Sequence, residues 1–138
     1  MAPELPELRR ELLTHPIQLI GVCPPLSQLS LVSKHITLAY TIKSLSVYFP
    51  AGCANIVQAY PYLSYDPESP TTRRPAGTPL LSFLSPNPYL LGDNITIDMD
   101  FNLTIHVRGT WLKIHVVNPD TFPHTVVALW TIIELEAP

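Results

Sequence analysis

Hydrophobic and polar residues alternate without interruption from Ile95 to Val107, with every odd position apolar and every even position polar. Neighbouring side chains on a β-strand point to opposite faces, so this pattern predicts one strand with an apolar face and a polar face. These 13 residues would span about 43 Å as a strand, whereas a usual strand has about 5–6 residues. We therefore expect an antiparallel β-protein in which this strand bends between two sheets or reaches beyond its domain.

A second alternating segment changes phase partway along. Its apolar residues occupy even positions from Ile36 to Ile42 and odd positions from Leu45 to Phe49. One extra residue inside a strand shifts the alternation in this way. The sequence therefore predicts a β-bulge or a break near Lys43 and Ser44.

Two further patterns extend the β-structure towards the C-terminus. Gly109 and Thr110 form a two-residue loop with glycine first, which favours a type II′ hairpin and predicts that Ile105 lies opposite Ile114. Residues 125–135 are almost continuously apolar, which is typical of a strand buried on both faces in the centre of a sheet.

The N-terminal third differs in character from the alternating segments. Residues 3–13 predict a short helix with an apolar stripe formed by Leu5, Leu8 and Leu12. A helix of two to three turns is marginal alone in water, so the stripe needs a surface to pack on, either its own sandwich or a neighbouring subunit. We expect residues 1–33 to form a helix and an extended arm, and residues 34–138 to form the β-domain.

A proline-rich loop is predicted at about residues 61–90. Loops longer than about 12–15 residues are usually functional or disordered, and this one carries aromatic residues that disordered linkers usually lack. Tyrosine and tryptophan are enriched at interfaces. The residues predicted to anchor loops or form an interface are Tyr62, Tyr65, Phe83, Tyr89 and Trp111, together with the three leucines of the N-terminal stripe.

The fold class predicted from these elements is all-β. We expect an antiparallel β-sandwich or jelly roll, preceded by the short helix and the extended arm. A chain of 138 residues is long enough for one such domain with a sizeable core.

Composition narrows the functional classes. Charged residues make up 14% of the chain, against about 25% in a typical soluble domain. This low charge leaves two interpretations open, a soluble monomer with a nearly neutral surface or an assembly that covers much of the surface. A net charge of −3 argues against nucleic acid as a partner. No apolar run reaches the roughly 18 residues of a membrane span, and the N-terminus lacks the order of a signal peptide.

Motifs for chemistry are sparse, and we predict neither an enzyme nor a bound cofactor. The segment 117–126 resembles the part of cupredoxins that supplies a copper-binding histidine, and the resemblance makes His124 that ligand. A blue-copper site also needs a cysteine and a second histidine, and no such residue follows His124. The alternative is that Asn118 and Asp120 form a turn through side-chain to backbone hydrogen bonds. The polar row that contains Asp98 and Asp100 is predicted to be a solvated strand face, because such neighbours stand nearly 7 Å apart.

The leader at 3–33, the turn at 48–52 and the strands at 92–135, with the low charge, together resemble small jelly-roll decoration (cement) proteins of tailed bacteriophage capsids. Those proteins sit as trimers on capsid lattice points and clasp neighbours with arms. The resemblance implies a structural virion protein on the capsid surface, with other copies of itself and the major capsid protein lattice as partners. It also implies synthesis in the host cytoplasm without a signal peptide.

Two other functional classes remain open from the sequence. Flat aromatic side chains stack on sugar rings, so Trp111 and the loop tyrosines could belong to a carbohydrate-binding or adhesin module. The alternative that rests on His124 is a cupredoxin-like domain with an incomplete copper site. The sequence leaves open whether Cys23 and Cys53 form a disulfide.

Overall fold

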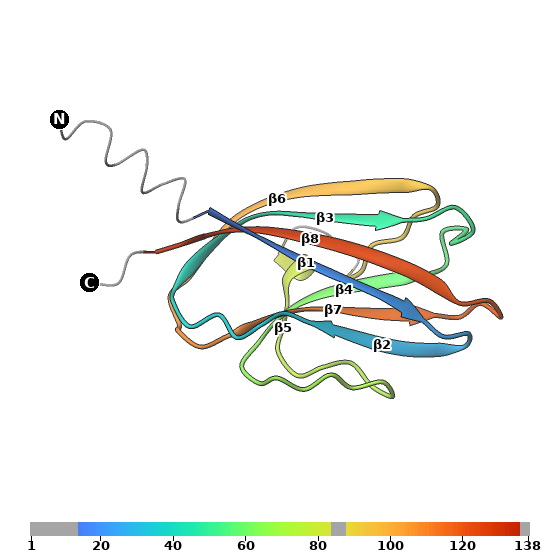
Figure 1. Ribbon diagram of the computed structural model, residues 1–138, viewed down its shortest axis with the longest axis horizontal. Coiled ribbons are helices and arrows are strands. Elements are labelled where there is room, and N and C mark those ends of the chain that lie inside the picture. Colours follow the sequence, from blue (N-terminus) through green and yellow to red (C-terminus); the bar gives the residue numbers. More distant parts are fainter. Residues whose placement is uncertain (1–13, 84–87, 136–138) are drawn as a thin grey trace.

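The computed structural model describes residues 14–83 and 88–135. Within them the chain forms eight β-strands and a single-turn 3-10 helix (Figure 1). The elements are β1 (Thr14–Cys23), β2 (Ser27–Val32), β3 (Tyr40–Phe49), β4 (Gln58–Ser64), β5 (Thr78–Pro79), η2 (Leu80–Phe83), β6 (Ile95–Ile105), β7 (Trp111–Asn118) and β8 (His124–Glu134).

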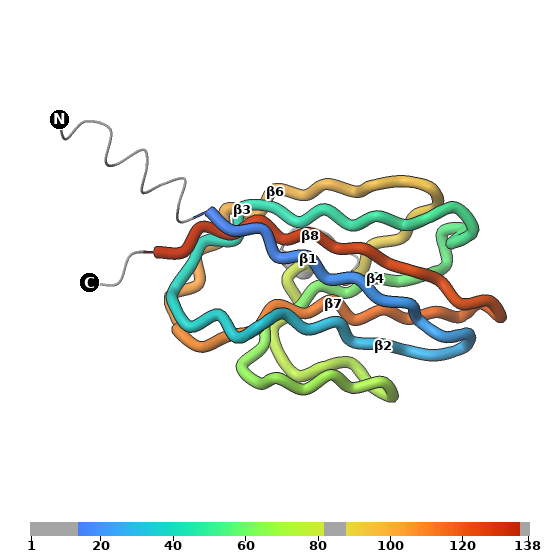
Figure 2. The backbone as a smooth tube through the Cα atoms, in the orientation of Figure 1, coloured from blue at the N-terminus to red at the C-terminus, as the bar shows by residue number. Residues whose placement is uncertain are grey.

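The strands form two four-stranded antiparallel sheets. Sheet A has the order β1-β8-β3-β6, and sheet B has the order β2-β7-β4-β5. The first strand thus pairs with the last, the second with the seventh, the third with the sixth and the fourth with the fifth. This nested pairing is that of one long hairpin rolled into two layers, which is the jelly-roll arrangement. The tube in Figure 2 shows the blue start and the red end of the described chain lying side by side. The predicted all-β sandwich is confirmed.

The predicted strand with alternating faces is confirmed, but the prediction that it bends between sheets or leaves the domain is wrong. β6 ends at Ile105, pairs with β3 and forms an edge of sheet A, so it does not bend between sheets. The predicted bulge is also confirmed, because the register of β3 shifts between Ile42 and Ser44 against both of its neighbours. Lys43 is the extra residue relative to β8, which explains why the apolar positions of β3 change from even to odd.

The predicted hairpin at Gly109 and Thr110 is wrong. β6 belongs to sheet A and β7 to sheet B, so these residues lie in a connection that crosses between the sheets. Ile36 anchors the crossing, since its carbonyl oxygen accepts a hydrogen bond from the Thr110 amide and its own amide donates to the Thr110 carbonyl oxygen. Apolar rows of two consecutive strands face one core whether they share a sheet or lie in opposite sheets. Alternation alone therefore could not separate the two arrangements.

The core lies between the inner faces of the two sheets. Its largest fully buried side chains include Trp130 from β8 and Tyr40 and Phe49 from β3. The Tyr40 hydroxyl forms a hydrogen bond of 2.9 Å with Oγ1 of Thr110, and burial raises the pKa of Tyr40 to about 12. The phenol and the hydroxyl satisfy each other inside the core, as most buried polar groups do.

The predicted arm at 1–33 does not lie outside the sandwich as one unit. β1 pairs with β8 along its whole length, and β2 pairs with β7, so residues 14–32 build one edge of each sheet. The extended pattern that indicated an arm is that of two edge strands. The predicted helix at 3–13 lies outside the described residues. Among the residues described, no helix is long and apolar enough to cross a membrane.

Truncations test this division of the chain. We expect residues 14–138 to unfold cooperatively within about 4 °C of the full chain, a shift equivalent to about 1 kcal/mol, because both sheets remain complete. Removal of residues 1–33 deletes β1 and β2, including the buried Leu19 and Cys23, and should abolish cooperative unfolding. Thermal unfolding followed by circular dichroism measures both. A cooperative transition in the chain 34–138 would contradict the assignment.

Candidate functional site

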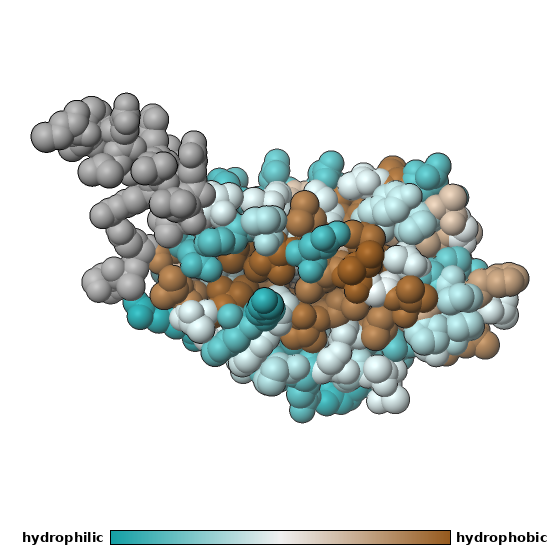
Figure 3. Space-filling model, viewed as in Figure 1, coloured by the Kyte–Doolittle hydropathy of each residue, from teal (hydrophilic) through white to brown (hydrophobic). Residues whose placement is uncertain are grey.

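The outer face of sheet A carries a continuous group of apolar side chains, which we call the apolar strip: Ile20, Val22, Tyr48, Val127 and Leu129. Ile20 and Val22 of β1 are 60% and 57% exposed, and Tyr48 and Leu129 are each 39% exposed. Val127 lies opposite Ile20 in β1 and opposite Tyr48 in β3, so these three form a row across the sheet. Figure 3 shows hydrophobic surface gathered over β1 and β8.

The strip arises because β8 is apolar at both parities. Its inner positions, such as Val126 and Trp130, are buried in the core, whereas Leu129 points outward and is exposed. The prediction that this strand is central is confirmed, since β8 lies between β1 and β3. The prediction that both of its faces are buried is wrong, because among the described residues no second layer covers the outer face of sheet A.

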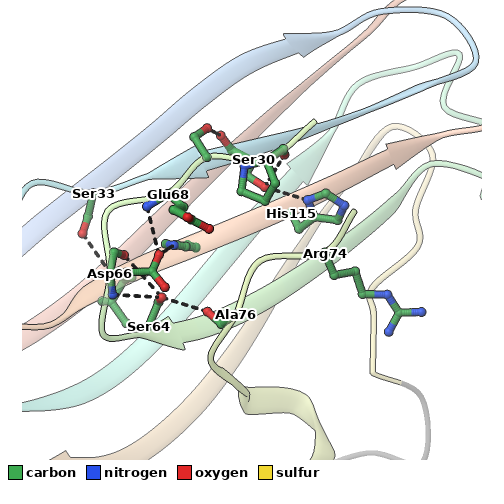
Figure 4. A network of polar contacts seen from close by, with 12 residues as sticks. Ser30, Ser33, Ser64, Asp66, Glu68, Arg74, Ala76 and His115 are labelled. Carbon is green, nitrogen blue, oxygen red and sulfur yellow. Dashed lines mark hydrogen bonds and ion pairs between the residues drawn. The ribbon is translucent and has the colours of Figure 1, made fainter. Parts of the chain in front are cut away.

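Sheet B differs, because residues 65–77 fold over its outer face (Figure 4). The Ser30 hydroxyl donates a hydrogen bond of 2.9 Å to the Pro70 carbonyl oxygen, and the Ser64 hydroxyl donates one of 2.8 Å to the Ala76 carbonyl oxygen. Gly77 closes the loop at φ +142°, where a Cβ atom would lie 2.3 Å from the Leu63 carbonyl oxygen. The expectation that part of the proline-rich loop is pinned on a surface is confirmed, and the surface belongs to the same chain.

Two ionisable side chains of β7 are buried beneath this loop. Lys113 is fully buried, and its Nζ lies 2.9 Å from Oδ1 of Asp66, whose side chain is 38% exposed. The hydrogen bond from Lys113 lowers the pKa of Asp66. His115 is also fully buried. The loop therefore depends on a charge pair with one buried and one accessible partner.

The imidazole of His115 is held at both nitrogens. Nδ1 lies 2.7 Å from the Ser30 hydroxyl oxygen, and Nε2 lies 2.8 Å from Oε1 of Gln28. Burial, followed by the nearby positive charge of Arg74, lowers the pKa of His115 to about 4. A serine beside a histidine resembles part of a nucleophilic site. Ser30 is 3% exposed and His115 is 0% exposed, so this pair connects the loop to the sheet and has no access to a substrate.

The structure describes the side chains of four of the predicted interface residues, and their surroundings differ. Tyr62 is buried under the loop, Tyr65 is 57% exposed, and Tyr89 packs against Tyr60 with ring centroids 5.2 Å apart. Trp111 stacks on His35 with the ring centroids 4.2 Å apart, so the imidazole covers one face of the indole. The three leucines of the predicted stripe (Leu5, Leu8 and Leu12) and the Phe83 side chain lie outside the described residues.

The turn predicted at Asn118 and Asp120 is confirmed. Oδ1 of Asn118 accepts a hydrogen bond of 3.0 Å from the Asp120 amide, and its Nδ2 donates to the carbonyl oxygens of Cys23, Pro24 and Phe122. Nε2 of His124 lies 2.8 Å from Oδ2 of Asp120, which lowers the pKa of that carboxyl group. Within residues 14–83 and 88–135, no group of three histidine, cysteine or acidic side chains could hold a metal.

The two cysteines are free thiols inside the fold. Cys23 and Cys53 are both fully buried, and burial raises the pKa of each thiol. A thiol held in its neutral form is a poor nucleophile and a poor metal ligand. The cysteines therefore act as small core residues, which is the usual role of buried free cysteine.

Sequence reasoning missed the apolar strip. A signal was present, because Ile20 and Val22, like Val127 and Leu129, occupy the parity opposite to the buried residues of their strands. A strand that is apolar at both parities is either covered on both faces or exposes one apolar face. The choice between these two possibilities depends on whether another layer covers the outer face of the sheet, and the sequence does not show this.

Comparison with known proteins yields a likeness of fold alone. No protein-family model matches the chain, and a search of curated proteins returns no match. Similar solved structures include the cyanophage Pam1 capsid asymmetric unit, at 8% identity and TM-score 0.48 over 88% of this chain and 85% of that chain. The mitogen from Yersinia pseudotuberculosis matches at 6% identity and TM-score 0.41, over 90% of each chain. The broad bean stain virus structure matches at 8% identity and TM-score 0.32, over 88% and 86%. Likeness at this level identifies no function.

Burial of His115 makes stability sensitive to acid. The unfolded chain binds a proton at this histidine below about pH 6.5, whereas the folded protein does so only near pH 4. The resulting stability is fully present above pH 6.5 and is lost as the pH falls towards 4. We expect the free energy of unfolding, measured with urea, to fall by about 2–3 kcal/mol between pH 7.5 and 4.5 from this group. A His115→Gln variant that retains the same decrease would contradict this origin.

The fold should lose more stability when Asp66 is replaced than when Lys113 is replaced. Asp66→Asn leaves a buried ammonium group without its counter-ion and should destabilise the fold by about 2 kcal/mol, a value reduced for the partial exposure of Asp66. Lys113→Met places an apolar side chain in the buried site and leaves a carboxylate that water can reach, so it should cost less. Urea unfolding at pH 7 measures both variants, and a larger loss for Lys113→Met would contradict this account.

Proposed function

We propose that this protein is a non-catalytic structural subunit of a virion, and that it decorates and stabilises a capsid lattice through oligomeric interfaces. The observation that carries the proposal is the apolar strip on sheet A. Contiguous exposed apolar surface mostly marks sites of association in soluble proteins, whereas single exposed residues need no explanation. The row formed by Ile20, Val127 and Tyr48 is contiguous across three strands.

The contrast between the two sheets supports this proposal. Residues 65–77 cover the outer face of sheet B. The buried Lys113 pairs with Asp66 of this loop, and the buried His115 pairs with Ser30 of β2. Sheet A has an apolar outer face without a corresponding cover among the described residues. A chain with 14% charged residues has little charge to keep such a face soluble. Association between subunits would bury it.

In this proposal the assembly is a closed homo-oligomer, with a trimer favoured, on the capsid surface. Residues 1–13 act as an arm that contacts a neighbour, and the major capsid protein lattice is the second partner. Glycan binding has less support, because His35 covers one ring face of Trp111.

The oligomeric state tests the proposal. We expect native mass spectrometry of the full chain to show a metal-free closed oligomer, and Ile20→Lys to convert it to a monomer. The substitution places a charge within the strip, on the edge strand β1, at a side chain that is 60% exposed, so the fold should tolerate it within about 0.5 kcal/mol.

Thr72→Lys provides the matched control. Thr72 is exposed on the loop over sheet B, so this variant adds the same charge on the opposite side of the molecule. It should keep the oligomer of the unsubstituted chain. A full chain that stays monomeric at every concentration, or equal dissociation by both lysine variants, would rule out the strip as the assembly surface.

A further inference from the structure

The second feature that lacks a partner is the free edge of sheet A. β6 has 11 residues, and β3 is its one pairing strand among the residues that the structure describes. An open edge presents a row of backbone amide and carbonyl groups that another strand can pair with. Proteins usually block such edges with charged side chains, especially lysine, or with proline, a bulge or a very short strand. From Ile95 to Asp100 the edge has no proline, lysine or bulge, its charged residues are Asp98 and Asp100, and the irregular residue Asn102 (φ +51°) comes after this stretch.

The inner side chains of this stretch are incompletely covered. Ile95 is 49% exposed, and Ile97 and Met99 are half-buried although they face the core side of the sheet. The cause is the unequal length of the two edge strands, since β5 at the corresponding edge of sheet B has 2 residues. A further strand beside β6 would bring its own apolar side chains over this row.

The outer side chains of the same stretch carry negative charge. Thr96, Asp98 and Asp100 are exposed and lie on one face, because they alternate with the inner row. Asp98 accepts a hydrogen bond from the Ser46 hydroxyl. Lys43 lies next to this row, but its Nζ donates to Oδ1 of Asn102 at 2.6 Å. Two carboxylates on adjacent outward positions therefore face any strand that pairs with this edge.

We propose that β6 binds an extended segment of a partner protein, in which lysine or arginine alternates with apolar residues. The partner strand would extend sheet A by backbone hydrogen bonds, which is the β-augmentation mode of peptide recognition. Its cations would lie opposite or diagonal to Asp98 and Asp100, and its apolar side chains would cover Ile95, Ile97 and Met99. Opposite charges across neighbouring strands stabilise pairing and like charges oppose it.

The acidic row also argues against a second copy of β6 as the occupant. Symmetric antiparallel pairing centred on Asp98 would place the Asp98 carboxylates of the two copies opposite each other, with Asp100 of each copy diagonal to Asp98 of the other. This site adjoins the apolar strip, since Tyr48 lies opposite Thr96, but it uses the backbone edge of β6 and not the outer face of β1 and β8. The inference therefore goes beyond the proposed function and does not depend on it.

The test uses a synthetic peptide about six residues long, the usual length of a strand, that alternates lysine with valine or isoleucine and is capped at both ends. We expect titration into the ¹⁵N-labelled full chain to shift the amide signals of β6 and β3. A peptide with glutamate in place of lysine should bind at least tenfold more weakly. The double variant Asp98→Asn, Asp100→Asn should weaken binding of the lysine peptide by about tenfold, because it removes two cross-strand charge pairs.

Two controls separate this edge from other surfaces. Glu68→Gln removes an exposed carboxylate from the loop over sheet B and should leave the affinity unchanged. Ile20→Lys disrupts the apolar strip and should also leave peptide binding intact, so a failure of the assembly proposal is distinguishable from a failure here. Absence of β6 shifts, equal binding of the glutamate peptide, or full affinity in the double variant would overturn the inference. Concentration-dependent protection of β6 amides without peptide would assign the edge to a second copy and would overturn it as well.

Discussion

Burial of the two inner sheet faces against each other is the interaction on which the rest of this molecule depends. Nested pairing brings β1 beside β8 and β2 beside β7, so strands from the two ends of the chain enclose the same core. Trp130 and Tyr40 lie inside, and Thr14 lies opposite Ile133 at the end of sheet A where both termini leave. The described chain therefore begins and ends at the same end of sheet A.

The outer faces of the two sheets differ in what covers them. Sheet B is covered by its own chain, and the cover is polar, since Lys113, His115 and Ser30 each bind a group of the loop or of a neighbouring strand. Such a cover is specific, because each buried polar group needs its partner. Sheet A has no cover of this kind among the described residues, and its exposed apolar side chains need no directional partner. The first face stabilises the fold, and the second is available for association.

The edge strands β5 and β6 of the two sheets also differ. β5 is very short, which is a common way to protect an edge from unwanted pairing. β6 is long, apolar on one side and acidic on the other, and its charges select among possible partners instead of blocking all of them. The apolar strip lies on the outer face of β1, β8 and β3, and it meets the outer row of β6 where Tyr48 lies opposite Thr96.

Alternation along the chain was enough to predict β3, β6 and β7, their inward and outward sides, and the bulge at Lys43, because alternation and its phase are local properties of a pleated chain. The turn at Asn118 and Asp120 was also local, since side-chain to backbone hydrogen bonds within two residues decide it. Only the tertiary structure decided which sheet each strand joined, because apolar rows such as those of β6 and β7 face one core from the same sheet or from opposite sheets. It also decided which apolar face of β8 remained exposed. Coverage of a face depends on residues such as 65–77, whose position comes from hydrogen bonds and ion pairs to residues distant in sequence.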